Sequence, residues 1–373
     1  MGKFRWVFAL FSLLLVAAGC STQASNQASD TPITSSVASP SSVAAGPIVV
    51  GLSGVQADLV LARTDGTVIA RISGVPVDDE HPIGAYLVAA HDGSKEWTVD
   101  RSGVIRQVAP AAARLLAPGS GSPLVLSDST AIIGCHRDAG GACVAEAVDL
   151  VTGTVRPLLT VPNTASEMQY GISLKVMDVN ADQTTVWFRE VSGASVPTLA
   201  VVAVDLKTGD SSAHSLPSAL LDDQDLAISR DGKWVAGQES AGVDSTNLAI
   251  RHLHVVSTDT GLDSDVQGSA VYVGGLRTPS VLFSPDSSRV AWWGGLNNGS
   301  ITMRVNISPV AGTGKTIYPP ENPNNPNSVN GVYWLDSGTL VTMFGGLTAV
   351  NIETGSAVRL PGAIDYLLGV LLP

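Results

Sequence analysis

The sequence predicts an all-β protein built from repeated strand units, and three observations point to this class. From Pro47 onward, short runs of β-forming residues alternate with turn residues, and no amphipathic helix of ten or more residues is evident. Aromatic residues are only 5% of the chain, so its 45% hydrophobic content is mostly Ala, Val and Leu, which suits many short strands. The third observation is a glycine turn that recurs along the chain.

This recurring turn sets the number of units. Glycine is expected in it because a tight hairpin places one residue at positive φ. Successive turn glycines are 37, 50, 56, 52, 51 and 43 residues apart, a mean near 48, which is the period of a four-stranded propeller blade. Seven turns therefore predict a β-propeller of seven four-stranded blades over residues 47–373. The turn glycines are Gly66, Gly103, Gly153, Gly209, Gly261, Gly312 and Gly355.

The first and last segments of this region are expected to share one blade. The first unit has only three predicted strands, at residues 47–53, 57–63 and 67–73. The chain ends on an apolar run at residues 364–372 that has no partner of its own. We expect this C-terminal strand to complete the first blade, closing the ring and covering an apolar edge.

A second motif, Ser-x-Asp, precedes the glycine turn by about thirty residues. Good copies lie at residues 226–236 and 281–292, and looser ones at 124–132, 176–187 and 332–341. The Asp is expected to close the turn between a blade's first two strands by accepting bonds from its own backbone. These stretches resemble the WD-repeat-like blades of TolB-type extracytoplasmic propellers, and the resemblance covers most of residues 47–373.

The N-terminus has the features of a bacterial lipoprotein signal peptide. Residues 1–19 combine basic residues with a 13-residue apolar run, shorter than the roughly 20 residues of a transmembrane helix. Leu15–Cys20 resembles a lipobox, which implies diacylation of Cys20 and cleavage before it; the alternative is an ordinary secretory signal cut nearby. Residues 20–46 are then a lipidated Cys and a disordered Ser/Ala/Thr/Pro tether with a reach of about 25–30 Å. The resemblance implies a lipid-anchored protein on the extracytoplasmic side of a bacterial cell membrane.

The charge balance excludes one class of partner. The formal net charge is −12, and removal of Lys3 and Arg5 with the signal peptide leaves 19 basic residues against 33 acidic ones. Nucleic-acid binding requires basic patches that neutralise phosphates, so no nucleic-acid partner is expected. We expect a monomer that meets the membrane through the diacyl group on Cys20.

Two cysteines remain once Cys20 is assigned to the anchor. Cys135 and Cys143 lie on the two strands on either side of a predicted three-residue turn, Asp138–Gly140. A turn of this length places the two cysteines directly opposite each other. Such neighbours have a spacing compatible with a disulfide, and an extracytoplasmic location is oxidising. The sequence therefore predicts a disulfide between Cys135 and Cys143, with two free thiols as the alternative.

Motifs for chemistry are weak. Residues 308–316 resemble a phosphate-binding loop, but Pro309 replaces the expected first Gly, so a hairpin in the sixth blade is favoured. His252 and His254 share one face of a predicted strand without a visible third metal ligand. Acidic runs at residues 78–81 and 222–225 lack the spacing of a calcium loop. No catalytic residue, metal or cofactor is expected.

The function that fits these observations is a non-catalytic binding or scaffolding module for an envelope protein or polymer. A propeller presents loops from a rigid scaffold, which suits recognition. Two alternatives stay open: a propeller enzyme of lyase or glycosidase type, and a solute-binding lipoprotein, each with its site in the central funnel. The fold alone does not choose between them.

Overall fold

The computed structural model is nearly all β. The predicted signal peptide, Cys20 and most of the predicted tether lie outside the described part. In that part, no helix is long and apolar enough to cross a membrane. The residues described are 46–54, 58–73, 87–91, 96–116, 123–126, 131–162, 172–192, 198–217, 220, 226–243, 249–266, 271–272, 281–297, 301–318, 330–343, 345–362 and 364–372.

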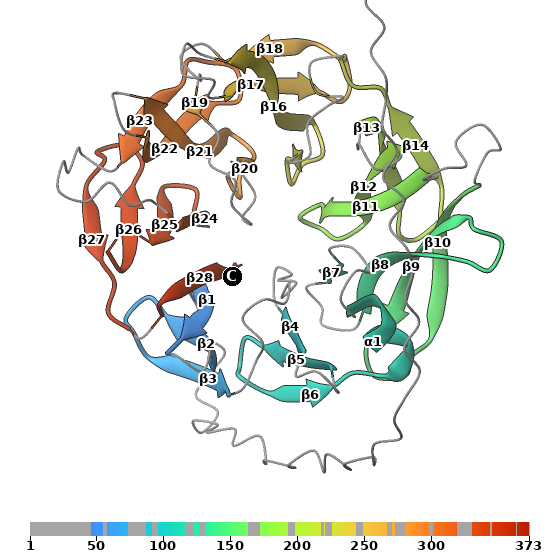
Figure 1. Cartoon of the computed structure of the whole chain (residues 1–373). Coiled ribbons are helices and arrows are strands. Elements are labelled where there is room, and N and C mark those ends of the chain that lie inside the picture. Colours follow the sequence, from blue (N-terminus) through green and yellow to red (C-terminus); the bar gives the residue numbers. More distant parts are fainter. Residues whose placement is uncertain are drawn as a thin grey trace, which may run out of the picture. The chain divides into compact units, whose positions relative to one another are not determined.

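The strands form antiparallel sheets in chain order, which we call blades 1 to 7 (Figure 1). Blade 1 joins β28 (Tyr366–Leu371) to β1 (Ile48–Ser53), β2 (Asp58–Arg63) and β3 (Val68–Ile72). Blade 2 contains β4 (Leu87–His91), β5 (Glu96–Asp100) and β6 (Ile105–Gln107). Blade 3 contains β7 (Leu124–Val125), β8 (Ala131–Arg137), β9 (Cys143–Asp149) and β10 (Val155–Val161). Blade 4 contains β11 (Ile172–Val179), β12 (Thr185–Ser192), β13 (Thr198–Asp205) and β14 (Ser211–His214).

Blades 5 and 6 are joined through a short additional strand. Strand β19 (Val271–Tyr272) pairs with both β17 and β21, so the two blades form one continuous sheet. Blade 5 contains β15 (Ala227–Ile228), β16 (Trp234–Val243), β17 (Ala249–Ser257) and β18 (Asp263–Asp265). Blade 6 contains β20 (Val281–Phe283), β21 (Arg289–Asn297), β22 (Ile301–Pro309) and β23 (Lys315–Tyr318). Blade 7 contains β24 (Asn330–Asp336), β25 (Thr339–Met343), β26 (Leu347–Asn351) and β27 (Ala357–Arg359).

This arrangement confirms the predicted β-propeller with seven blades. Among the described residues, blade 2 has three strands and each of the others has four. The C-terminal strand also completes the first blade, as predicted, because β28 pairs antiparallel with β1 (Figure 1). Leu371 lies opposite Ile48 in this pairing. The apolar side chains of β28 explain the pairing: Leu367 and Leu371 are fully buried, and Leu367 packs in one cluster with Val49 of β1.

Apolar side chains between neighbouring blades form the core. Trp187 of blade 4 packs against Val235 and Val256 of blade 5, and Trp334 of blade 7 packs against Ile307 of blade 6. These tryptophans therefore serve as packing between blades.

One helix, α1 (Pro110–Leu116), lies between blades 2 and 3. It buries Ala112, Leu115 and Leu116 against Ile132 and other core residues of blade 3. Its seven residues make too short a periodic segment to be recognised in the sequence.

Candidate functional site

One end of the blades is formed by two sets of turns. In an antiparallel four-stranded blade, the connection from the first to the second strand and that from the third to the fourth lie at the same end. We call these the A–B and C–D turns, and the end that they form the turn face. Both motifs found in the sequence belong to it, since the Ser-x-Asp stretches form A–B turns and the recurring glycines lie in C–D turns.

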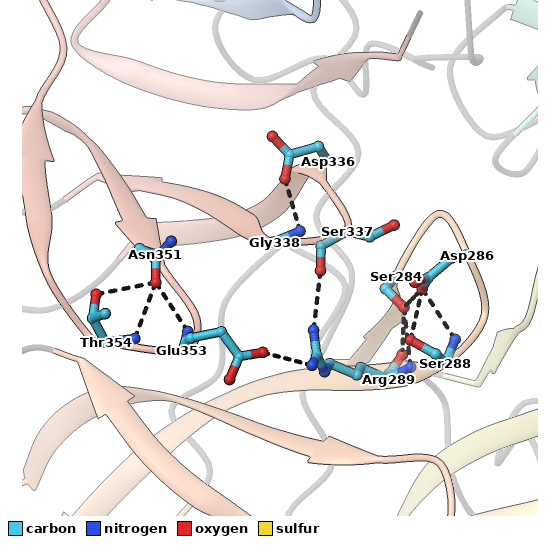
Figure 2. Close-up of polar contacts among 10 residues, drawn as sticks. All are labelled: Ser284, Asp286, Ser288, Arg289, Asp336, Ser337, Gly338, Asn351, Glu353 and Thr354. Carbon is cyan, nitrogen blue, oxygen red and sulfur yellow. Dashed lines mark hydrogen bonds and ion pairs between the residues drawn. The ribbon is translucent and has the colours of Figure 1, made fainter.

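The A–B turn of blade 6 shows what the Ser-x-Asp motif does (Figure 2). The hydroxyl of Ser284 donates to Oδ1 of Asp286 at 2.6 Å and accepts from the backbone N–H of Arg289 at 3.0 Å. Asp286 also accepts from the backbone N–H of Ser288 at 3.1 Å. Ser284 is completely buried, so its hydroxyl satisfies polar groups inside the turn that water does not reach.

Blade 5 repeats this geometry with a glycine at the tightest position. Ser229 donates to Asp231 at 2.7 Å, and Gly232 has φ of 71°. In blades 4 and 6 the corresponding residues are Gln183 and Ser287, which adopt φ of 56° and 61° without being glycine. These two residues are strained, because a residue with a Cβ rarely adopts positive φ.

In blades 2, 3, 4 and 7, the C–D turn begins with an Asp or Asn at the end of the third strand. In blade 7, Oδ1 of Asn351 accepts from the backbone N–H groups of Glu353 and Thr354 at 3.1 and 3.0 Å (Figure 2). Glycines of positive φ close six of the seven turns, as predicted, whereas Gly312 of blade 6 is not among the residues with positive φ. The six are Gly66, Gly103, Gly153, Gly209, Gly261 and Gly355.

Turn hydrogen bonds lower the pKa of several carboxylates of this face. The backbone N–H groups of Thr67, Thr152 and Thr208 lower the pKa of Asp65, Asp149 and Asp205, respectively. Burial alone would raise the pKa of Asp286, but the bonds from Ser284 and Ser288 outweigh it, and the net shift is downward. The turn face therefore carries fixed negative charge at neutral pH.

Side chains on the turn face also connect neighbouring blades. Arg289 of blade 6 donates to Oε1 of Glu353 at 2.6 Å and to the backbone oxygen of Ser337 at 3.3 Å, both in blade 7 (Figure 2). Between blades 5 and 6, the backbone N–H of Asp231 donates to Oγ of Ser287 at 3.1 Å. The polar groups of these turns thus hold the blades together.

The two ends of the described chain meet at the same face. Arg101, in the C–D turn of blade 2, donates to the backbone oxygens of Gly46, Leu371 and Leu372. Because Gly46 precedes β1 and Leu371 ends β28, this one guanidinium contacts both ends. The sequence offered no sign of this role, since Arg101 lies 55 residues from one partner and 271 from another.

The histidines considered as metal ligands lie in blade 5. His254 is buried, with Nε2 at 3.0 Å from Glu239 and Nδ1 at 3.0 Å from Asp263. His252 lies opposite Glu239 in the strand register. Nowhere in the described part of the chain do three or more His, Cys, Asp or Glu residues converge in a way that could hold a metal ion. His254 is therefore a hydrogen-bonding residue that links β16, β17 and β18.

The predicted pairing of the cysteines is wrong in register. Cys135 lies opposite Ala145, and Cys143 lies opposite Arg137, so the two are diagonal neighbours on one face of the hairpin. The turn is longer than expected, because Asp138 accepts from the N–H of Ala142 and the residue with positive φ is Gly141. Both cysteines are buried free thiols, and the predicted disulfide is absent. Burial raises the pKa of both thiols, and neither is activated.

The segment that resembled a phosphate-binding loop is a hairpin, as predicted. Strands β22 and β23 pair on either side of it, with Ile307 opposite Lys315. No helix follows Lys315, because β23 begins there. The arrangement of a phosphate-binding loop ahead of a helix is therefore lacking in this described segment.

Comparison with known proteins assigns no family to the chain and finds solved structures of low sequence identity. No protein-family model matches the chain, and neither does any curated protein sequence. TolB from Acinetobacter baumannii is 15% identical over 71% of this chain and 61% of its own, with a TM-score of 0.45. The β-propeller fold follows from the arrangement of the chain's own sheets.

Two further solved structures match the chain at similarly low sequence identity. The β-propeller domain of the Trilobed protease from Pyrococcus furiosus is 9% identical over 74% of this chain and 79% of its own, with a TM-score of 0.45. The tricorn protease is 12% identical over 81% of this chain and 33% of its own, with a TM-score of 0.47. The chain thus spans less than two thirds of TolB and a third of the tricorn protease.

Proposed function

We propose that this protein is a lipid-anchored, extracytoplasmic propeller that acts as a non-catalytic binding or scaffolding module for an envelope protein or polymer. The anchor rests on the Leu15–Cys20 motif and the Ser/Ala/Thr/Pro segment that follows it. A diacyl group supplies the two chains that stable membrane attachment requires.

One structural observation carries the non-catalytic part of the proposal. The polar groups that the sequence singled out at the turn face are used to hold the turns and the blades. Ser284 and Asp286 bond each other within their turn, and Arg289 bonds across to the next blade. His254 is likewise occupied by Glu239 and Asp263. Because these polar groups bond within the propeller, they make it rigid, and a rigid scaffold is suited to presenting a surface to a binding partner.

Replacing Cys20 with Ser tests the anchor. In the full-length protein expressed in bacteria, Cys20→Ser should move the propeller from the membrane to the soluble extracytoplasmic fraction and abolish incorporation of labelled palmitate, because the thiol is the site of acylation. The matched control is Ser21→Ala, which leaves the thiol in place and should stay membrane-bound. Membrane retention of Cys20→Ser without label would contradict the proposal.

Crosslinking in intact cells tests the binding role. A wild-type propeller that functions as a scaffold should capture the same envelope component in repeated experiments, and Cys20→Ser should lose that component if anchoring positions it. Turnover of a glycoside or polysaccharide by the purified protein would instead support the enzyme alternative. Capture of a small solute would support the solute-binding alternative.

A further inference from the structure

The chain enters and leaves the propeller at the turn face. Ile48, the first residue of β1, lies opposite both Leu371 at the end of β28 and Arg63 at the end of β2. Arg63 begins the C–D turn of blade 1. The start of β1 therefore lies at the turn-face end of the blade, and β1 then runs toward the opposite end.

Arg101 holds Gly46, two residues before the start of β1, at the same end of the blade. It belongs to the C–D turn of blade 2, and it donates to the backbone oxygen of Gly46 as well as to that of Leu371. The exit of the N-terminal segment is thus fixed by a contact within the turn face. Its position does not depend on the course of the residues before Gly46.

We infer that the turn face is the membrane-proximal face of the anchored protein, and that the opposite end of the blades is directed away from the lipid. This inference rests on the proposed anchoring through Cys20. The partner of the turn face is a lipid bilayer, which it meets at the distance set by the segment from residue 21 to Gly46. The Ser/Ala/Thr/Pro composition of that segment predicts a reach of about 25–30 Å, close to the roughly 30 Å length of the nine-residue strand β17.

The chemistry of the turn face indicates how it meets the bilayer. Asp65 is exposed, Asp149 and Asp205 are half-buried, and the backbone N–H groups that these carboxylates bind are not available to lipid phosphates. An anionic membrane surface repels these carboxylates within a Debye length of about 8 Å. The turn face is therefore near the membrane without inserting into it.

Two cysteine variants in one blade test this orientation. Asp259 lies in the C–D turn of blade 5, and Val243 lies at the other end of the same blade, where it pairs with Ala249. Both are exposed, whereas the native Cys135 and Cys143 are buried. A fluorophore attached to Asp259→Cys or Val243→Cys is measured in the full-length lipoprotein on vesicles whose headgroups carry a quencher.

We expect quenching at Asp259→Cys to exceed that at Val243→Cys by about twofold, because the ends of β17 are about 30 Å apart. Equal quenching, or stronger quenching at Val243→Cys, would overturn the inference. If either variant melts at a lower temperature than the wild type, Lys207→Cys on the turn face and Ala139→Cys in the β8–β9 turn form a second pair. The same order of quenching is expected from them.

Vesicle flotation separates this inference from the proposed function. If the protein floats with vesicles and Cys20→Ser does not, the anchor is supported, and the quenching order alone decides the orientation. If the wild-type lipoprotein fails to float, both the anchor and the orientation are wrong. Reversed quenching on floating protein rejects only the orientation.

Discussion

Two junctions in the propeller, one within blade 1 and one between blades 6 and 7, are held in different ways. Both bury apolar side chains, with Leu367 packed against Val49 where β28 joins blade 1, and Trp334 packed against Ile307 between blades 6 and 7. At the turn face, however, the ion pair between blades 6 and 7 is made by the half-buried side chain of Arg289. At blade 1 the main chain itself is paired, and the two chain ends share Arg101.

The difference follows from the covalent chain. Blades 6 and 7 are consecutive in sequence, so their separation is limited even without contacts between them. Strand β28 and blade 1 lie at opposite ends of the sequence, and only noncovalent contacts keep them together. Bringing such distant segments together costs loop-closure entropy, which burial and strand pairing must offset. The junction between β28 and β1 is therefore expected to be more sensitive to mutation than the junction between blades 6 and 7.

Deletion of residues 364–373 should have the largest effect. It removes the buried side chains of Ile364, Leu367 and Leu371, each of which contributes about 1.5–3 kcal/mol. Their sum is comparable with the total stability of a typical protein, about 5–15 kcal/mol. We expect the truncated protein to lose cooperative thermal unfolding by circular dichroism and to become sensitive to protease.

The control for this deletion removes the same number of residues elsewhere. Deletion of residues 21–30, which precede the described part of the chain, should leave the melting temperature unchanged. If the 364–373 truncation melted like the full-length protein, β28 would have no role in holding blade 1.

The terminal strand could be predicted from the sequence, and other features could not. Its apolar run and the three-stranded first unit are both visible in the sequence. The register of the Cys135–Cys143 hairpin depends instead on the turn, where Asp138 caps a loop two residues longer than the pattern suggested. A turn of either length begins with the same residues, so the sequence does not distinguish them.

The contacts between blades were also beyond prediction. Arg289 appears in the sequence as one residue of a Ser-x-Asp motif, and nothing near it marks Glu353 as its partner. The left-handed conformation of Gln183 likewise has no sequence signal, because non-glycine residues rarely adopt it. Periodicity reveals which residues face a core, but it does not reveal which polar groups meet across blades.

Replacing Gly51 with Ala should have an intermediate effect on the same junction. A Cβ at Gly51 would overlap the side chain of Ile364 and the backbone oxygen of Tyr366, where the β1–β28 ladder changes register. Overpacking of this kind costs about 1–3 kcal/mol. We expect a lower melting temperature with retained folding. Gly46→Ala is the matched control, because a Cβ there meets no atom within 4 Å, and it should be neutral.

Replacing Arg289 with Ala should have the smallest effect, because the bridge between blades 6 and 7 is exposed. The side chains of Arg289 and Glu353 are 32% and 61% accessible, so solvent screens their attraction. Exposed ion pairs contribute about 0–1 kcal/mol, and the loss on Arg289→Ala in urea unfolding should fall in that range and shrink at high salt. Glu353→Gln removes the ion pair but leaves the bond to Ser337, so it should cost less. A loss as large as that of Gly51→Ala would mean that the side-chain bridge is as important as the paired strands, and the distinction between the two junctions would fail.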